Sequence, residues 1–234
     1  MTPTIDFLKR VTLFQALPEP ALVEIARLST VRSVEEGGFY FIQGDGARYL
    51  YVLTVGRVKL TQVTLDGQQV AMRMVGPEQM FAGAAILPPP GGYPVSAEAV
   101  EDSSALAWEA DSFKSLSGKY PQLSFNLMQL MQAYILEMQS RYRELSTERV
   151  EQRVARALVR LTAQTGIQSP EGAIVLQLSR QDLAEMAGTT LFTASRILAD
   201  WERRGIVATG RERVQIMNPH GLVSIAEDLA PRER

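Results

Sequence analysis

The sequence predicts an α+β protein in which a small antiparallel β-barrel or sandwich precedes a long helix and a winged helix-turn-helix. Three observations support this fold class. Short strand-like runs separated by glycine turns occupy residues 31–108, a continuous helical pattern covers residues 119–147, and two short helical patterns joined by a glycine follow within residues 178–207. We therefore expect three parts, comprising residues 1–118, 119–147 and 148–234.

The composition excludes several kinds of chemistry. The chain of 234 residues is 46% hydrophobic, contains one histidine and no cysteine, and carries a formal net charge of -2. Disulfides, thiolate metal sites, cysteine nucleophiles and cysteine-ligated iron–sulfur clusters are therefore excluded. No carboxylate pair or phosphate-binding loop stands out either. We expect a protein that is not an enzyme and that has neither a metal nor a cofactor.

The hydropathy pattern predicts no membrane segment. No apolar run reaches the length of a membrane helix, and the start MTPTIDFLKR lacks the apolar stretch of a signal peptide. We expect a cytoplasmic protein. The near-neutral net charge means that any nucleic-acid interface must be a local arginine patch.

The N-terminal segment, residues 5–30, has helical spacing of its apolar residues with breaks expected at Pro18 and Pro20. We interpret it as a packed amphipathic helix pair. The strand-like runs that follow include FYFIQGDG, YLYVLTVGRVKLTQV and QVAMRMVG. Regular short strands with glycine turns are typical of a sandwich or barrel.

The long helical pattern contains a heptad seam. Its members recur at alternating steps of four and three residues, and they are Leu127, Met131, Tyr134, Met138, Arg141 and Leu145. The seam predicts a homodimer interface, with Arg141 reaching to its edge. The alternative is a helix packed on its own β domain, and off-seam Leu123, Leu130 and Ile135 indicate that the helix does both.

A further helix is predicted after Thr147, with Val150, Val154 and Leu158 on its buried side. Its arginines are expected mainly on a solvated face, with some near nucleic-acid phosphate; they are Arg149, Arg153, Arg156 and Arg160.

The stretch LSRQDLAEMAGTTLFTASRILADWERRGIV predicts the helix-turn-helix. Ser179 and Asp182 form a capping pattern, Gly188 ends the first helix and Thr190 caps the second. In the second helix the buried side is Ala194, Ile197, Leu198 and Trp201, and the opposite face is Phe192, Ser195, Arg196, Ala199 and Arg203. Such a second helix is suited to the DNA major groove.

A hairpin wing is predicted around Thr209, Gly210 and Arg211. Arg211 and Arg213 either touch phosphate or are ordinary loop charges, and the sequence favours neither interpretation. A last helix is expected after Gly221.

The run SRQDLAEMAGTT, with SRIL, WE and GIV after it, resembles the DNA-binding end of the cyclic-AMP receptor (catabolite activator) family, which includes the anaerobic fumarate and nitrate reduction regulators. The segments EGGFYFIQGD, YLYVLTVGRVKL and DGQQVAM look like the β-roll that binds cyclic nucleotides in that family. The resemblance implies a parallel dimer through the long helix, double-stranded DNA and RNA polymerase as partners, and an activator role.

The resemblance also locates the region where an effector would bind. Nucleotide-binding members have a Gly-Glu pair that holds the ribose and then an Arg-Ser/Thr-Ala run that holds the phosphate. This chain has Gly83-Ala84 and Val95-Ser96-Ala97, and no arginine lies between Arg73 and Arg141. Pro88 to Pro90 are also unlike the family's segment. We interpret the pocket as degenerate, with Ser96-Ala97 as a packed strand start, and expect no useful cyclic AMP binding. Another small-molecule effector stays open.

The same resemblance suggests how DNA is contacted. Arg180 and the turn residues Thr189 and Thr190 match positions that hold phosphate. Arg196 suits guanine, and Ser195 beside it resembles the Ser-Arg pair of the anaerobic branch. Where relatives have a charged pair, this chain has Leu191-Phe192, which either meets thymine methyl groups or, for Leu191 above all, packs inward. The predicted DNA-contacting set is Arg180, Thr189, Thr190, Leu191, Phe192, Thr193, Ser195, Arg196, Arg211 and Arg213.

Two functions follow from these features. The first is a homodimeric, sequence-specific transcription regulator that binds a palindromic site through residues 190–203. The alternative is a ligand-sensing module whose C-terminal domain contacts mainly protein. Selection of binding sites from randomised duplex DNA distinguishes them, because only the first predicts an enriched motif.

Overall fold

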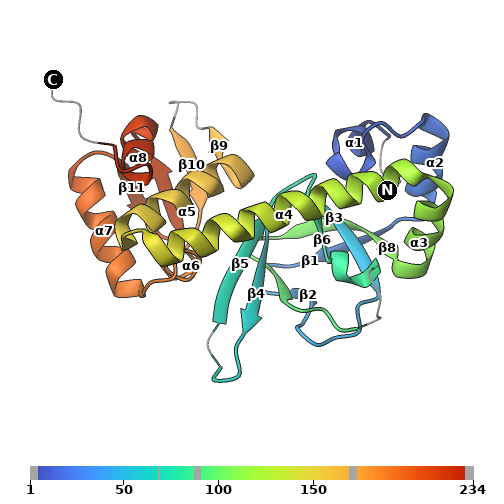
Figure 1. Ribbon diagram of the computed structural model, residues 1–234, viewed down its shortest axis with the longest axis horizontal. Coiled ribbons are helices and arrows are strands. Elements are labelled where there is room, and N and C mark those ends of the chain that lie inside the picture. Colours follow the sequence, from blue (N-terminus) through green and yellow to red (C-terminus); the bar gives the residue numbers. More distant parts are fainter. Residues whose placement is uncertain (1–4, 68, 87–90, 169–172, 230–234) are drawn as a thin grey trace. The chain divides into compact units, whose positions relative to one another are not determined.

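The computed structural model describes residues 5–67, 69–86, 91–168 and 173–229 (Figure 1). Packing divides the chain into two units. Unit 1 comprises residues 1–68 and 72–138, and unit 2 comprises residues 139–234 together with 69–71. The boundary lies within the long helix α4 (Pro121–Thr147). The prolines 88–90, which the sequence singled out, lie outside the described residues.

Short helices begin unit 1: α1 (Ile5–Arg10), the 3-10 helix η1 (Thr12–Phe14) and α2 (Glu19–Arg27). The break expected at Pro20 is wrong. Pro18 lies at the N-cap of α2, and Pro20 lies within the first helical turn. Proline is tolerated there because the first backbone N–H groups of a helix have no intrahelical acceptor.

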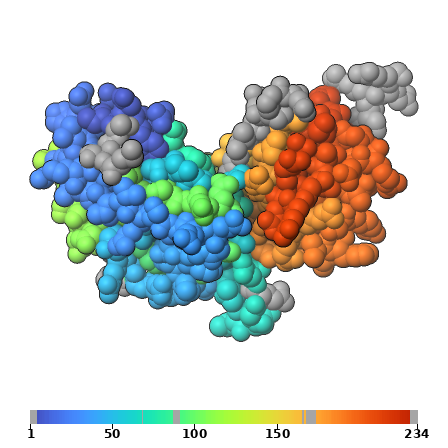
Figure 2. Space-filling view, turned by 180° about the vertical axis from the view of Figure 1, so that it is seen from behind, coloured from blue at the N-terminus to red at the C-terminus, as the bar shows by residue number. Residues whose placement is uncertain are grey.

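The β-rich part of unit 1 is built from two four-stranded antiparallel sheets. One has the order β1-β8-β3-β6 and the other β2-β7-β4-β5. The strands are β1 (Thr30–Val34), β2 (Phe39–Phe41), β3 (Tyr49–Val55), β4 (Val58–Val63), β5 (Gln69–Val75), β6 (Met80–Phe81), β7 (Ser96–Ala99) and β8 (Ser103–Glu109). The β4–β5 hairpin projects from the other strands in Figure 2, and Leu65 near its turn is exposed. This is the β-roll that the sequence predicted.

Helices cover one side of the β-roll core. Trp108 on β8 is fully buried, packs edge-on against Phe14 and donates its indole N–H to the Ile25 carbonyl at 2.8 Å. Helix α3 (Ala110–Lys119) and the start of α4 add Phe113, Leu116 and Leu123 to this core. The apolar faces of the N-terminal helices and of α4 are thus buried against the same side of the β-roll.

Unit 2 is a helix-turn-helix domain with its own sheet. Its order is α5 (Val150–Thr165), β9 (Ile167–Gln168), β10 (Ile174–Gln177), α6 (Arg180–Met186), α7 (Leu191–Arg203), β11 (Val207–Gly210), β12 (Arg213–Ile216) and α8 (Pro219–Ala226). The strands form the antiparallel order β11-β12-β10-β9. Helix α8 begins before Gly221, because Asn218 caps it by accepting a hydrogen bond from the Gly221 N–H at 2.8 Å. Trp201 of α7 is fully buried in this domain.

None of the helices in the described parts of the chain combines the length and hydropathy needed to cross a bilayer.

Candidate nucleic-acid interface and effector region

The caps predicted for the helix-turn-helix are confirmed. The Ser179 hydroxyl accepts a hydrogen bond from the Asp182 backbone N–H at 3.0 Å and lies 2.7 Å from the Asp182 carboxylate. Thr190 likewise accepts from the Thr193 N–H at 3.2 Å. Because both first turns have their free N–H groups satisfied by side chains, the two helices start at fixed residues.

The turn between α6 and α7 requires glycine at position 188. Gly188 has φ +61°, a conformation that side-chain-bearing residues rarely adopt. A Cβ atom there would also lie 2.6 Å from the side chain of Leu145. Leu145, which the sequence placed in the dimer seam, therefore lies over this turn while remaining 56% exposed.

Helix α7 has one buried and one exposed side. Ala194, Leu198 and Trp201 are buried. We call the opposite side the recognition face, and it comprises Phe192, Ser195, Arg196 and Ala199. Phe192 is 78% exposed, Arg196 and Ala199 are exposed, and Ser195 is half-buried. Leu191 is also exposed at the helix start, so neither apolar residue packs into the domain.

The remaining predicted contact residues surround this helix. Thr189 and Thr193 are half-buried beside the exposed cap Thr190. Arg180, the first residue of α6, donates to the Thr209 hydroxyl of the wing at 3.1 Å. The backbone N–H of Thr209 donates to Glu202 of α7 at 2.8 Å. Helices α6 and α7 are thus tied to strand β11 by polar contacts.

The wing is a hairpin of β11 and β12, but its turn differs from the prediction. Gly210 pairs with Arg213, so the turn consists of Arg211 and Glu212 rather than being centred on Gly210. Glu212 takes the positive φ, at +52°. Arg211 and Arg213 are both exposed. The phosphate-contact and loop-charge interpretations of these arginines both stay predictions.

In the effector region the four candidate residues do not form a polar site. Gly83 and Ala84 lie in the 3-10 helix η2 (Gly83–Ile86), and Ser96 and Ala97 begin β7. Ser96 is 6% exposed and its hydroxyl accepts a hydrogen bond from the Gln43 backbone N–H at 2.9 Å. Ala97 is fully buried between Phe41 and Leu60 of the neighbouring strands. The interpretation of Ser96-Ala97 as a packed strand start is confirmed.

Aromatic side chains fill the β-roll beside these residues. The rings of Phe41 and Tyr93 stack with centroids 3.8 Å apart, and those of Tyr51 and Phe81 with centroids 5.0 Å apart. The Tyr93 hydroxyl accepts from the Tyr49 N–H at 2.9 Å and donates to the Tyr49 carbonyl at 2.8 Å. Burial raises the pKa of the Tyr51 and Tyr93 hydroxyls, so both phenols remain neutral at ordinary pH. This cluster was not predicted from the sequence, although aromatic residues are consecutive in FYF and alternate in YLY.

Helix α4 exposes part of the predicted seam and several apolar residues beside it. Met131, Tyr134 and Leu145 are exposed and Met138 is half-buried, but Leu127 packs against the core of unit 1. A row of exposed or half-buried apolar residues at steps of three and four residues consists of Met128, Met131, Ile135, Met138, Tyr142 and Leu145. Ile135, which was expected off the seam, is 52% exposed. Leu127 and Arg141 are half-buried, whereas Met128, Ile135 and Tyr142 are exposed.

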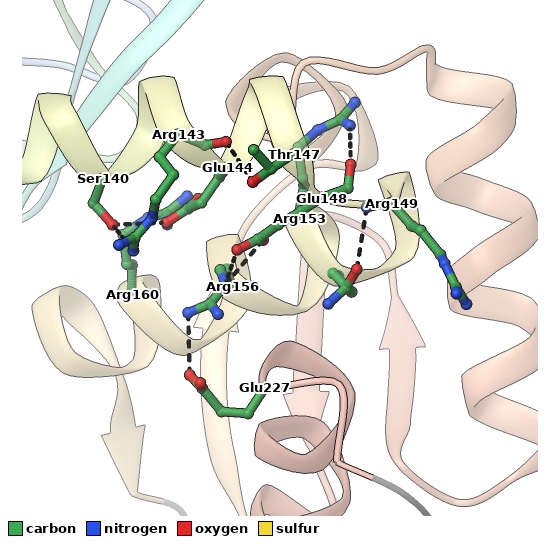
Figure 3. A network of polar contacts seen from close by, with 11 residues as sticks. Ser140, Arg143, Glu144, Thr147, Glu148, Arg149, Arg153, Arg156, Arg160 and Glu227 are labelled. Carbon is green, nitrogen blue, oxygen red and sulfur yellow. Dashed lines mark hydrogen bonds and ion pairs between the residues drawn. The ribbon is translucent and has the colours of Figure 1, made fainter.

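The sequence suggested that the arginines of α5 form mainly a solvated face, and this expectation is wrong. Arg156 bonds Glu148 and Glu227, and Arg160 bonds Glu144 (Figure 3). Arg153 donates to three backbone carbonyls. Only Arg149 of the four is classed as exposed. The sequence does contain a signal for these pairs. The acids Glu144 and Glu148 are four residues apart, and so are the arginines Arg156 and Arg160.

Known protein families match the two parts of the chain separately. Residues 31–120 match the cyclic nucleotide-binding domain and residues 152–225 match the Crp-like helix-turn-helix domain. The chain is 32% identical over 199 residues to the cyclic AMP receptor protein of Thermus thermophilus, covering 85% of this chain and 89% of the relative.

Two solved structures extend the comparison. The Thermus thermophilus catabolite activator protein is 30% identical with a TM-score of 0.53, covering 94% of this chain and all (100%) of that one. FixK2 from Bradyrhizobium japonicum has a TM-score of 0.74 at 22% identity, covering 84% of this chain and 96% of that one, and it shows the shared fold alone.

Proposed function

This chain belongs to the family of cyclic AMP receptor and fumarate and nitrate reduction regulators, and is a DNA-binding transcription regulator of that type; from this premise we propose that it is a homodimeric activator that binds a palindromic promoter site without cyclic AMP. The observation that carries the proposal is the recognition face of α7. RNA polymerase is the protein partner that an activator requires.

The recognition face has the chemistry of a major-groove reader. Arg196 is exposed and can offer two donors to the O6 and N7 atoms of guanine. Phe192 and Leu191 present apolar surface suited to thymine methyl groups. No carboxylate occurs between Leu191 and Ala199, so nothing on this face repels the phosphate backbone.

The exposed side of α4 supports the homodimer. Leaving a row of Met, Ile, Tyr and Leu side chains in water is unfavourable, and a second copy of the helix would bury it. The row has heptad spacing, with Met128, Ile135 and Tyr142 at one core position and Met131, Met138 and Leu145 at the other. Pairing along it would give two recognition helices related by a twofold axis.

The effector region supports independence from cyclic AMP. Ala84 stands where nucleotide-binding relatives have a carboxylate, and Val95 where they have an arginine. The Ser96 hydroxyl is already used by Gln43, and a cyclic phosphate would have no cation to pair with in this segment. The name of the Thermus relative therefore does not carry over to the signal that this chain senses.

The experiment that tests the function is selection of binding sites from randomised duplex DNA by the full chain without added nucleotide. We expect an enriched inverted repeat whose half-sites lie about one helical turn, ~34 Å, apart. Hydroxyl-radical footprinting should then show two protected half-sites. A library with no enriched motif would instead favour a module that acts through protein contacts.

A further inference from the structure

The end of α4 and the link that follows it are joined to α5 by two pairs of opposite charges. On α4 the carboxylate of Glu144 accepts from Nη1 of Arg160, at 2.8 and 2.7 Å to its two oxygens. Glu148, four residues later, is paired with Arg156, four residues before Arg160, at 2.9 Å. The pairs are nested around the link between the helices, so the two helix segments run antiparallel across them. We call Glu144, Glu148, Arg153, Arg156 and Arg160 the α4–α5 network (Figure 3).

The network is largely shielded from water, which makes its geometry restrictive. The side chain of Glu144 is 5% exposed, and those of Arg160 and Arg156 are 20% and 22% exposed. Ser140 donates a further hydrogen bond to Glu144 at 3.2 Å. A carboxylate this deeply buried is tolerated only while its partners stay in place. The last turns of α4 are therefore held to α5 and not merely connected to it by the chain.

Arg153 extends the network to the helix-turn-helix. Its guanidinium donates to the Glu148 carbonyl at 3.0 Å, to the Ala187 carbonyl at 3.0 Å and to the Gly188 carbonyl at 3.1 Å. One side chain thus holds the link after α4 and the turn before the recognition helix. Leu145 lies over the same turn. All these contacts lie within unit 2.

We propose that the α4–α5 network fixes the direction of the recognition helix relative to the end of the dimerisation helix, and so sets the spacing between the two DNA half-sites. The inference rests on the proposed homodimer. Between α4 and α5 only Glu148 and Arg149 lie outside helix, and such a short link leaves several backbone torsions free to vary. Glu144, Arg153 and Arg160 are then positioning residues, since none of them belongs to the recognition face.

Half-site spacing is a readout that loss of stability alone would not change. Each inserted base pair moves the second half-site by about 3.4 Å and turns it by roughly 35°. The selected palindrome is compared with duplexes that have one or two base pairs added to or removed from its centre. We expect the wild-type dimer to bind the two-base-pair variants at least about tenfold more weakly than the selected site.

The test variant combines Glu144→Met, Arg160→Met and Arg153→Met. Replacing a buried ion pair by apolar residues of similar size commonly leaves a domain folded, while the directional restraint is removed. The affinities of the variant for all spacings should lie within about threefold of one another. Its affinity for an isolated half-site should equal that of the wild type. Hydrogen exchange at the Glu148 amide, which donates to the Glu144 carbonyl at 3.0 Å, should become faster.

The matched control removes an ion pair in unit 1, by Arg57→Met with Glu101→Met, and should keep the wild-type spacing preference. Should the triple variant fail to fold, Arg160→Lys keeps the charge at this site and should relax the preference in the same direction. An unchanged preference in the folded variants overturns the proposal. The proposal is also overturned if the wild type binds every spacing equally. Sedimentation of that same sample then shows whether the protein is a dimer, and so whether the proposed homodimer fails as well.

Discussion

Unit 1 and unit 2 differ in whether the side chains of their candidate sites are buried or exposed. In unit 1 the side chains of Phe41, Tyr51, Phe81 and Tyr93 are buried together in the core of the β-roll, and the Ser96 hydroxyl is hydrogen-bonded to the backbone. In unit 2 the recognition face is left exposed, and Arg153 and Arg160 are engaged in hydrogen bonds and an ion pair. A shared fold does not by itself establish which site is used, so each must be judged from its own side chains.

The largest effect that separates the two units is expected from Phe41→Ala. Removing a buried ring from the aromatic cluster should lower the free energy of unfolding of unit 1 by about 3–5 kcal/mol. Unit 2 should keep its affinity for an isolated half-site. Denaturant unfolding followed by hydrogen exchange in each unit measures both. Phe39→Ala, on the same strand but 47% exposed, is the control and should cost about 0.5 kcal/mol or less.

Arg196→Ala should weaken DNA binding by about 1–3 kcal/mol per half-site and remove the preference at one base pair. Arg180→Ala should instead weaken all sequences alike and lower the salt slope by about one for each phosphate contact. Titrations of the selected site and its single-base variants at several salt concentrations distinguish the two. Equal weakening of every variant by Arg196→Ala would assign this arginine to phosphate and leave base recognition to Phe192, Ser195 or DNA deformability.

Met138→Glu should weaken the dimer at least about tenfold, which corresponds to about 1.4 kcal/mol. The substitution places two like charges opposite each other in the α4 seam. Ala133→Glu adds the same charge to an exposed position outside the seam and should leave association unchanged. Analytical ultracentrifugation over a range of concentrations gives the comparison. An unaltered dimer in Met138→Glu would show that the helices do not pair along this row.

Replacing thymine by deoxyuridine at the positions nearest the start of α7 should weaken binding by about 0.8 kcal/mol for each methyl group removed. The loss should disappear in Phe192→Ala, since that variant no longer contacts the methyl group. Competition gel shifts measure differences of this size. If deoxyuridine has no effect on the wild type, Phe192 serves some purpose other than reading thymine.

Cyclic AMP should produce the smallest effect, namely none. Calorimetry should detect no saturable binding at the concentrations where family members respond, and added nucleotide should not change DNA affinity. Ala84→Glu with Val95→Arg tests the reason, because it restores the two charged groups at the family's positions. Tight binding by the wild type that maps to the β-roll would contradict our interpretation of this region.

Much of the fold followed from the sequence because its determinants are local. Ser179, Gly188 and Thr190 specify the helix ends and the turn by capping and by a positive φ, and all three were identified in advance. Alternating apolar residues and glycine turns likewise predicted the β-roll. Pro20 and Gly221 misled, since each is compatible with the first turn of a helix.

The remaining errors concern contacts between elements. Which side of α4 faces its own β-roll depends on the depth of the core at Leu127 and not on heptad spacing, which fits two registers. The arginines of α5 resembled a solvated face until Glu144 of α4 and Glu148 of the link after it were seen to pair with them. Such pairings depend on how two helices are oriented, and a pattern within one helix does not determine that.

The two tryptophans of the chain are divided between the units, with Trp108 in unit 1 and Trp201 in unit 2, and both are fully buried. The molecule therefore has an intrinsic fluorophore in each half. Trp201 is part of the recognition helix itself and donates its indole N–H to Glu151 of α5 at 2.9 Å. In a Trp108→Phe variant, the emission of the remaining indole would report whether that helix is docked on its domain, before and after DNA is added, without any attached label.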